Sequence, residues 1–161
     1  MFALSSMVAA QRHSGDGDRG FLMQSAERRM VELQLGTLAE QAVARSEVKD
    51  FARRMEGDQT TVDEQLKAFA TARGVTLPVV LDAKDQALKD RLTALSGAAF
   101  DRSYIGAMVT CLQRDVAAFK GRSASHDGEI RDFASNTLST LRGDLKAAWR
   151  IRSNLQSMKG P

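Results

Sequence analysis

The segment "FARRMEGDQTTVDEQL", residues 51–66, decides the fold because its apolar residues recur at steps of three and four. This spacing places them on one face of an α-helix. The row is interrupted by an amide at Gln59, where a further apolar side chain is expected. The pattern predicts an amphipathic helix with one polar position on its inner face. The inward row consists of Val48, Phe51, Met55, Gln59, Val62, Leu66 and Phe69.

Length and charge place the chain among ordinary globular domains. Its 161 residues are enough for one domain with its own hydrophobic core. The 23 Lys and Arg residues exceed the 20 Asp and Glu residues only slightly, and they are scattered along the sequence. The nearest approach to a basic cluster is "WRIRSNLQSMK", residues 149–159. With one Trp and one Tyr to stack on bases, the sequence disfavours nucleic-acid binding.

Cysteine content and hydropathy exclude two further classes. Cys111 is the single cysteine, so the chain has neither an internal disulfide framework nor a cluster of thiolate metal ligands. No run approaches the ~20 apolar residues that a helix needs to cross a bilayer. We therefore expect no transmembrane segment in this sequence.

The N-terminal region differs in composition from the rest. Residues 1–11, "MFALSSMVAAQ", resemble the later part of an export signal but lack its basic first region. An unstructured start and a clipped signal are both consistent with this composition. Residues 12–20, "RHSGDGDRG", are rich in Gly and charge, which is typical of a linker. We predict a flexible tail over residues 1–19 and a helical bundle domain over residues 20–157.

From Phe21 onward the pattern is helical, because there are only two prolines and few adjacent β-branched residues. Ser46 is expected to cap the second helix, Gly74 to follow its end, and Asp127 to cap the last helix. The predicted helices cover about residues 20–44, 46–73, 81–95, 100–119 and 128–155.

Four long amphipathic helices and a short one predict an all-α, ferritin-like four-helix bundle. The segment Thr76–Leu95 contains the short helix and would carry the chain across the bundle between the second and fourth helices. An up-down-up-down bundle with a helical loop is the alternative topology.

Four segments together carry a resemblance to a bacterial family. They are "VELQLGTLAEQAVARSEVKDFARRMEGDQT" (31–60), "GVTLP" (74–78), "LSGAAFDRSYIGAMV" (95–109) and "IRDFASNTLSTLRGDL" (130–145). In this order they resemble the family called domain of unknown function 4142, whose members are often labelled outer-membrane or exported proteins. The resemblance implies a ferritin-like bundle and export to the bacterial envelope. It implies no established activity.

The chain departs from that family at three histidines. Relatives commonly have "DHT" at residues 58–60, "MVxDH" at 108–112 and "TLPxLxxHL" at 137–145. In this chain the three histidine positions hold Gln59, Leu112 and Asp144. If the histidines bind a ligand in relatives, we expect this chain to have lost it.

The sequence contains no recognised catalytic motif. A di-iron bundle needs Glu-x-x-His pairs, which are absent, and the two histidines lie in the tail (His13) and a loop (His126). Cys111 stands in an apolar row, where a thiol usually packs as a small hydrophobe. There is no Gly-x-Ser-x-Gly elbow, Walker loop or dinucleotide fingerprint. We predict neither an enzyme nor a cofactor.

Four residues are candidate inner polar positions: Glu32, Gln59, Cys111 and Asp144. Glu32 shares a stripe of the first helix with small residues that allow another helix to approach closely. A buried carboxylate must be paired, hydrogen-bonded or protonated, and we expect an ion pair with Arg53 or Arg54. Asp144 stands in a similar position on the last helix.

These observations predict a non-catalytic bundle that acts through interaction with another macromolecule, an unidentified protein or envelope component. We expect a monomer or a weak homodimer. The alternative is a metal- or small-ligand-binding protein that uses Glu32, Asp144 and Gln59. The expected location is the periplasm or cell envelope, or the cytoplasm if the N-terminus is not an export signal.

Overall fold

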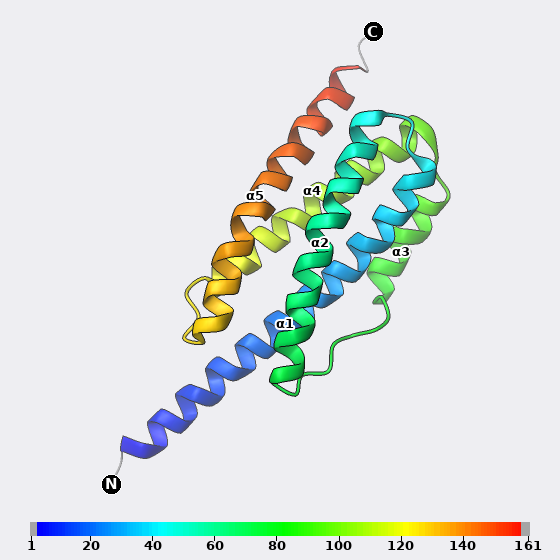
Figure 1. Ribbon diagram of the computed structural model, residues 1–161. Coiled ribbons are helices and arrows are strands. Elements are labelled where there is room, and N and C mark those ends of the chain that lie inside the picture. Colours follow the sequence, from blue (N-terminus) through cyan, green and yellow to red (C-terminus); the bar gives the residue numbers. More distant parts are fainter. Residues whose placement is uncertain (1–2, 159–161) are drawn as a thin grey trace.

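The computed structural model describes residues 3–158, with side chains from Asp16 onward, and within this range it contains helices and no strand (Figure 1). Met1 and Phe2, the start of the predicted export signal, lie outside the described residues. The all-α prediction is confirmed. The helices are α1 (Ala3–Ala42), α2 (Ser46–Ala72), α3 (Ala83–Thr93), α4 (Gly97–Arg122) and α5 (Gly128–Ser157).

The four long helices form two antiparallel pairs, α1 with α2 and α4 with α5 (Figure 1). Across the bundle α1 packs on α4 and α2 packs on α5. Figure 1 shows α2 and α4 running in the same direction, because the connection between them returns along the length of the bundle. This connection contains α3, which lies on α1 and α4. The crossover topology is that of a ferritin-like bundle, as predicted, and the up-down-up-down alternative is wrong.

The first helix begins at Ala3 rather than near Gly20, so the linker predicted over residues 12–20 is helical. The second half of this predicted linker also contacts the bundle. The buried carboxylate of Asp18 accepts hydrogen bonds from Arg122 Nη1 at 3.2 Å and Ser125 Oγ at 3.1 Å. A Cβ on Gly17 would lie 2.9 Å from that guanidinium, so the glycine allows a close approach. The tail boundary and the export signal stay predictions.

The predicted helix ends are correct at two positions and wrong at a third. Asp127 caps α5 by accepting from the backbone amides of Glu129 at 3.0 Å and Ile130 at 3.2 Å. Gly74, with φ +61°, follows α2 in the left-handed conformation that suits glycine. Ser46 is the first helical residue of α2 rather than its cap. The turn between α1 and α2 is instead held by Asp101 of α4, which accepts from two backbone amides there at 3.1 and 3.2 Å.

Aromatic side chains fill the core at both ends of the bundle. The Phe119 ring meets the rings of Phe21 and Phe133 edge to face, at centroid distances of 5.0 and 5.5 Å. These rings join α1, α4 and α5 near the α4–α5 turn. Towards the other end, Phe100 and Tyr104 stack at 5.6 Å. Edge-to-face and offset contacts of this kind are the favoured aromatic geometries.

Candidate functional site

A group of charged and amide side chains lies inside the bundle, and we call it the inner polar cluster. It is built from Arg28, Arg29 and Glu32 of α1, Gln59 of α2 and Asp115 of α4. Asp115 is fully buried and Arg29 is 1% exposed. The cluster therefore ties three helices together in a part of the core where water has little access.

Asp115 and Gln59 provide the acceptors for the two arginines. Arg29 donates from Nη1 to Gln59 Oε1 and from Nη2 to Asp115 Oδ2. The second oxygen of Asp115 accepts from Arg28 Nε at 2.5 Å. Each guanidinium is planar and holds its donors in a fixed fork, which suits this kind of multiple contact. Gln59 thus fills the polar position noted in the sequence by accepting from a buried cation.

Glu32 is buried, as its stripe suggested, but the predicted partner was wrong. Its Oε2 lies 2.9 Å from Nη2 of Arg29, one helical turn earlier, rather than near Arg53 or Arg54. Neither carboxylate oxygen accepts a hydrogen bond from the described part of the chain. Burial raises the pKa of Glu32, and the nearby arginines only partly oppose this shift.

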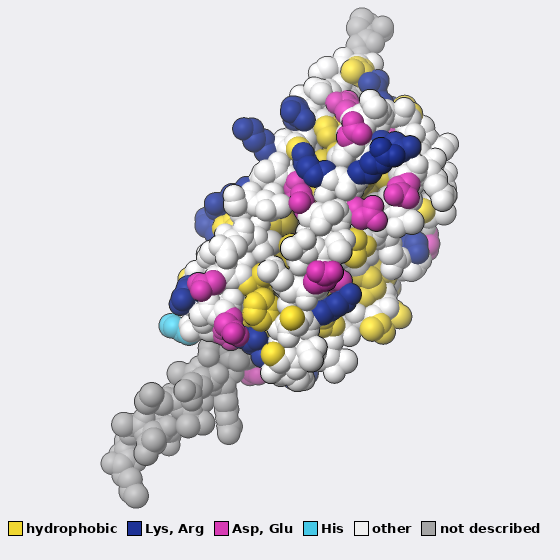
Figure 2. All heavy atoms as spheres, in the orientation of Figure 1, with side chains coloured by type: hydrophobic (Ala, Val, Ile, Leu, Met, Phe, Trp, Pro, Cys, Tyr) yellow, Lys and Arg dark blue, Asp and Glu magenta, His cyan; other side chains and the backbone are white. Residues whose placement is uncertain are grey.

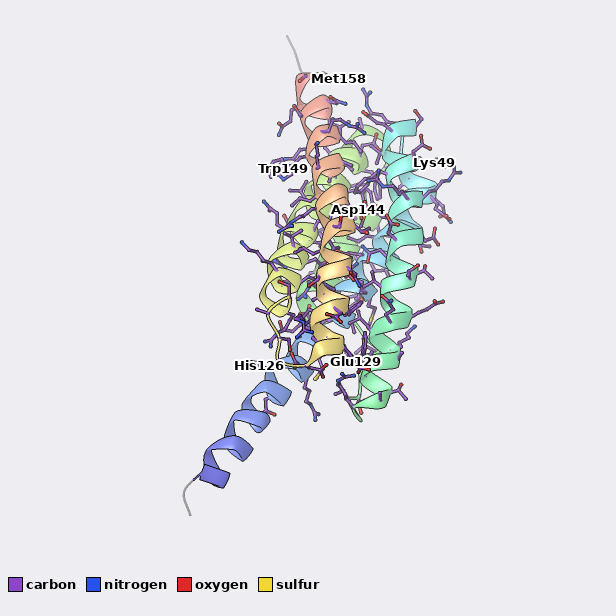
Figure 3. The ribbon with its side chains drawn as sticks, turned by 60° about the vertical axis from the view of Figure 1, so that its left-hand side comes forward. Lys49, His126, Glu129, Asp144, Trp149 and Met158 are labelled. Atoms are coloured by element: carbon purple, nitrogen blue, oxygen red, sulfur yellow. The ribbon has the colours of Figure 1, made fainter. Side chains whose placement is uncertain are left out.

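Asp144 of α5 forms a second ion pair, with Arg54 of α2. The distance from Arg54 Nη2 to Asp144 Oδ1 is 3.1 Å, and Figure 3 shows Asp144 on the side of α5 that faces α2. Oδ2 is buried without a hydrogen-bond partner among the described residues. Burial, with a smaller contribution from the negative charge of Asp58, raises the pKa of Asp144 to about 6 despite the neighbouring Arg54.

The stability of the protein is expected to fall as Asp144 ionises. Because the pKa of Asp144 is raised in the folded state, its contribution is most favourable below pH 4 and is lost as the pH rises through 6. From pH 4 to 7 we expect the wild type to lose about 1 to 3 kcal/mol of unfolding free energy relative to Asp144→Asn. Urea titrations of both proteins at several pH values measure this, and parallel pH profiles would contradict it.

Cys111 is buried, with 6% of its surface exposed, and lies on the side of α4 that lines a surface groove next to α3. Burial, with the negative charge of Glu32, raises the pKa of the thiol to about 12. The thiol is therefore protonated at neutral pH and is a poor nucleophile or metal ligand. Leu112, at the second histidine position of relatives, is completely buried among apolar side chains.

The three positions that hold histidines in relatives do not form one ligand set here. Gln59 bonds to Arg29, Leu112 is part of the apolar core, and Asp144 pairs with Arg54. Over residues 16–158 no group of three or more His, Cys, Asp or Glu side chains is arranged to hold a metal ion. The side-chain oxygens of Gln59 and Asp144 are instead paired with arginines of the same chain.

Arg29 and Asp115, which are buried and bonded to each other within the cluster, were not predicted from the sequence. A signal for both was present. Arg29 lies between Ser25 and Glu32 at helical spacing, and Asp115 continues the apolar row of Leu112 and Phe119. A charge within a buried row is the pattern that identifies such residues, because buried charges must be paired.

Removing the Gln59 acceptor is expected to destabilise the fold. In Gln59→Leu, Nη1 of Arg29 loses its partner while remaining buried, which should cost about 1 to 3 kcal/mol of unfolding free energy. Chemical denaturation followed by circular dichroism measures the loss. Gln65→Leu, on the exposed side of α2, is the matched control and should change stability by less than ~0.5 kcal/mol. Equal effects of the two substitutions would contradict this role.

The surface groove between α3 and α4 has a volume of about 580 Å³. Leu88 and Leu92 of α3 line it together with Leu95, which follows that helix, and small side chains including Ala107 and Cys111 line it from α4. Lys84, Arg91 and Arg114 stand at its margins with one acid, Asp85. The groove exists because α3 rests mainly on α1 and only lightly on α4.

Comparisons with solved structures agree with this architecture. A DUF305 fragment from Deinococcus radiodurans superposes with a TM-score of 0.77 at 15% identity, over 86% of this chain and 96% of that one. A Streptomyces coelicolor protein described as "putative secreted protein DUF305" gives 0.73 at 14% identity, over 87% and 94%. At these identities the likeness concerns the fold alone. No curated protein shows significant sequence similarity to the chain.

The sequence comparison covers nearly the whole chain. The model of the family described as a domain of unknown function (DUF4142) matches residues 3–151, from the first turn of α1 to the last turns of α5. The match includes the inner polar cluster, both ion-paired acids and the groove. No helix among the described residues is both long and apolar enough to cross a membrane. The chain belongs to the DUF4142 family.

Proposed function

We propose that the protein is a non-catalytic helical bundle of the bacterial cell envelope that acts by binding another envelope component. One observation carries the proposal: the Asp115 carboxylate accepts from both Arg28 and Arg29. Gln59 also accepts from Arg29, so these contacts join α1, α2 and α4. Arg29 Nε and both oxygens of Glu32 have no hydrogen-bond partner among the described residues. The bonded groups are occupied within the bundle, and interaction with other molecules is then left to the outer surface.

The envelope location is supported by the family resemblance, by the apolar start of the sequence and by the description of the Streptomyces coelicolor neighbour. Cell fractionation followed by N-terminal sequencing tests it. We expect the native protein in the periplasmic or membrane fraction with its first residues removed. Recovery in the cytoplasm with Met1 retained would contradict this location.

Site-specific photo-crosslinking in living cells tests the binding role. A photoreactive amino acid is placed at Ser153 on α5, at Gln65 on α2 and at Ala107 in the groove. The first two positions are exposed, on α5 and α2 respectively. We expect an adduct with an envelope component from one face and none from the others. Absence of adducts at all three positions would overturn the proposal.

Small-ligand binding is a second candidate function, favoured by the groove between α3 and α4. Its volume of about 580 Å³ lies within the ~300–1,000 Å³ typical of small-molecule sites. A mixed lining of leucines and small residues suits an organic ligand better than a metal ion, which prefers several oxygens or thiolates. Native mass spectrometry of protein isolated from cells should then detect a bound mass that Ala107→Trp removes.

A further inference from the structure

The outer surface of α4 and α5 has an unusual distribution of charge. Two segments of these helices, residues 97–122 and 133–157, contain only three acids: Asp101, Asp115 and Asp144. All three are buried, and each is bonded inside the bundle. The Lys and Arg side chains of the same segments point outward. These stretches of α4 and α5 therefore present cations to the solvent without any exposed carboxylate.

We define the basic face by five cations and one aromatic residue: Arg102, Arg142, Lys146, Trp149, Arg150 and Arg152. Apart from Arg152, which is partly covered, these side chains are exposed. None of the five cations forms an ion pair with another residue of the described chain. In Figure 2, Lys and Arg side chains project from the upper left edge of the molecule, where α5 lies in Figure 1.

Trp149 gives this face an apolar component. Its side chain is 45% exposed, and Figure 3 shows it on the side of α5 that faces away from α2. Arg152 lies over the ring, with Cζ 5.1 Å from its centroid. Within the described chain, Trp149 is the one strongly exposed aromatic residue. A tryptophan with one polar edge, surrounded by cations, is typical of surfaces that meet the interfacial region of a bilayer.

A hollow between α4 and α5 brings two of these cations together. It has a volume of about 190 Å³ and is lined by Arg102 and Gly106 of α4 and by Arg152, Leu155 and Gln156 of α5. Two guanidinium groups and an amide can donate to the oxygens of a phosphate group, and arginine suits this task because its donors form a planar fork. Leu155 is apolar and Gly106 has no side chain, so the hollow also has room for an apolar part of the same ligand beside its phosphate group.

We propose that the basic face binds the surface of a bilayer rich in anionic phospholipids, with a lipid phosphate seated between Arg102 and Arg152. The proposal rests on the proposed function and names the envelope component that this face recognises. From Arg142 to Arg152 the basic face extends along α5 for about 15 Å, so it can contact several lipid headgroups at once. Each Lys or Arg near such a surface strengthens binding about fivefold. A single exposed ring disfavours a single-stranded nucleic acid, which needs successive stacking platforms.

Vesicle co-sedimentation tests this proposal with the full chain. Vesicles of phosphatidylcholine alone are compared with vesicles of phosphatidylcholine and phosphatidylglycerol in equal parts. We expect binding only to the anionic vesicles, and release at high salt because exposed charges are then screened. Lys146→Glu with Arg150→Glu should weaken partitioning at least about 30-fold. Arg53→Glu with Arg91→Glu, an equal change of charge on α2 and α3, should leave it within about threefold.

Further measurements distinguish binding of a lipid phosphate from binding of inorganic phosphate or DNA. Arg102→Gln with Arg152→Gln should weaken vesicle binding, and millimolar inorganic phosphate should not compete. Full competition by phosphate, tighter binding of duplex DNA through the same residues, or equal effects of the two Glu variants would each overturn the proposal. The milder Lys146→Gln with Arg150→Gln replaces the Glu variant if that protein is not folded by circular dichroism. A crosslink from Ser153 to a protein partner, without vesicle binding, would overturn this inference and leave the proposed function standing.

Discussion

Replacing Asp115 with Ala is expected to lower the free energy of unfolding by about 3 to 5 kcal/mol, the largest effect of any polar substitution in the chain. Asp115 is fully buried and accepts from both Arg28 and Arg29. Without its carboxylate, Arg29 stays buried with much of its charge uncompensated. Burial already lowers the pKa of Arg29, which reflects the cost of holding this cation in the core. Urea denaturation at neutral pH measures the loss.

A combined variant distinguishes an unpaired charge from a simple cavity. Asp115→Leu together with Arg28→Met and Arg29→Met removes the ionic groups as a set and should recover most of the stability, because a buried ion pair contributes little beyond its own desolvation. Glu32 remains without its arginine in this variant, so we include Glu32→Gln. A loss below about 1 kcal/mol in Asp115→Ala would contradict the role assigned to the cluster.

Phe119→Ala is expected to cost a similar amount, about 3 to 5 kcal/mol, through loss of packing. The ring is completely buried and meets Phe21 of α1 and Phe133 of α5. Its removal opens a cavity where three helices join. Trp149→Ala is the matched control, since it removes a larger ring from a position that is 45% exposed. Thermal and chemical unfolding should show a loss below about 1 kcal/mol for the control, and equal losses would contradict this view of the core.

The helices were predictable because their apolar rows are long and regular. The crossover followed from the length of residues 76–95, and the Asp127 cap from its position before an apolar row. The start of α1 was missed because glycine and charge between residues 12 and 20 outweigh its weak apolar pattern. The cap at Ser46 was wrongly predicted for a different reason. Asp101, which holds that turn, is more than fifty residues away in sequence.

The site was predictable only in part. An amide in an apolar row marked Gln59 as an inner residue, and small neighbours marked Glu32. Their partners depend on the register between helices, which a single helical pattern does not specify. Arg29 was overlooked because a long cation on an amphipathic helix usually reaches solvent. The basic face was predictable only as the loose cluster of residues 149–159, because the sequence does not show that Asp101, Asp115 and Asp144 are buried.

Calorimetric titration of the wild-type protein with zinc, copper and ferrous iron measures whether the inner polar groups form a purely structural network or hold a metal ion. We expect the structural network. The triple variant Gln59→His, Leu112→His and Asp144→His, which restores the histidines of relatives, serves as the comparison. We predict no stoichiometric binding by the wild type, because Gln59 and Asp144 are bonded to arginines. Tight binding of one ion per wild-type chain, abolished by Asp144→Asn, would contradict the account.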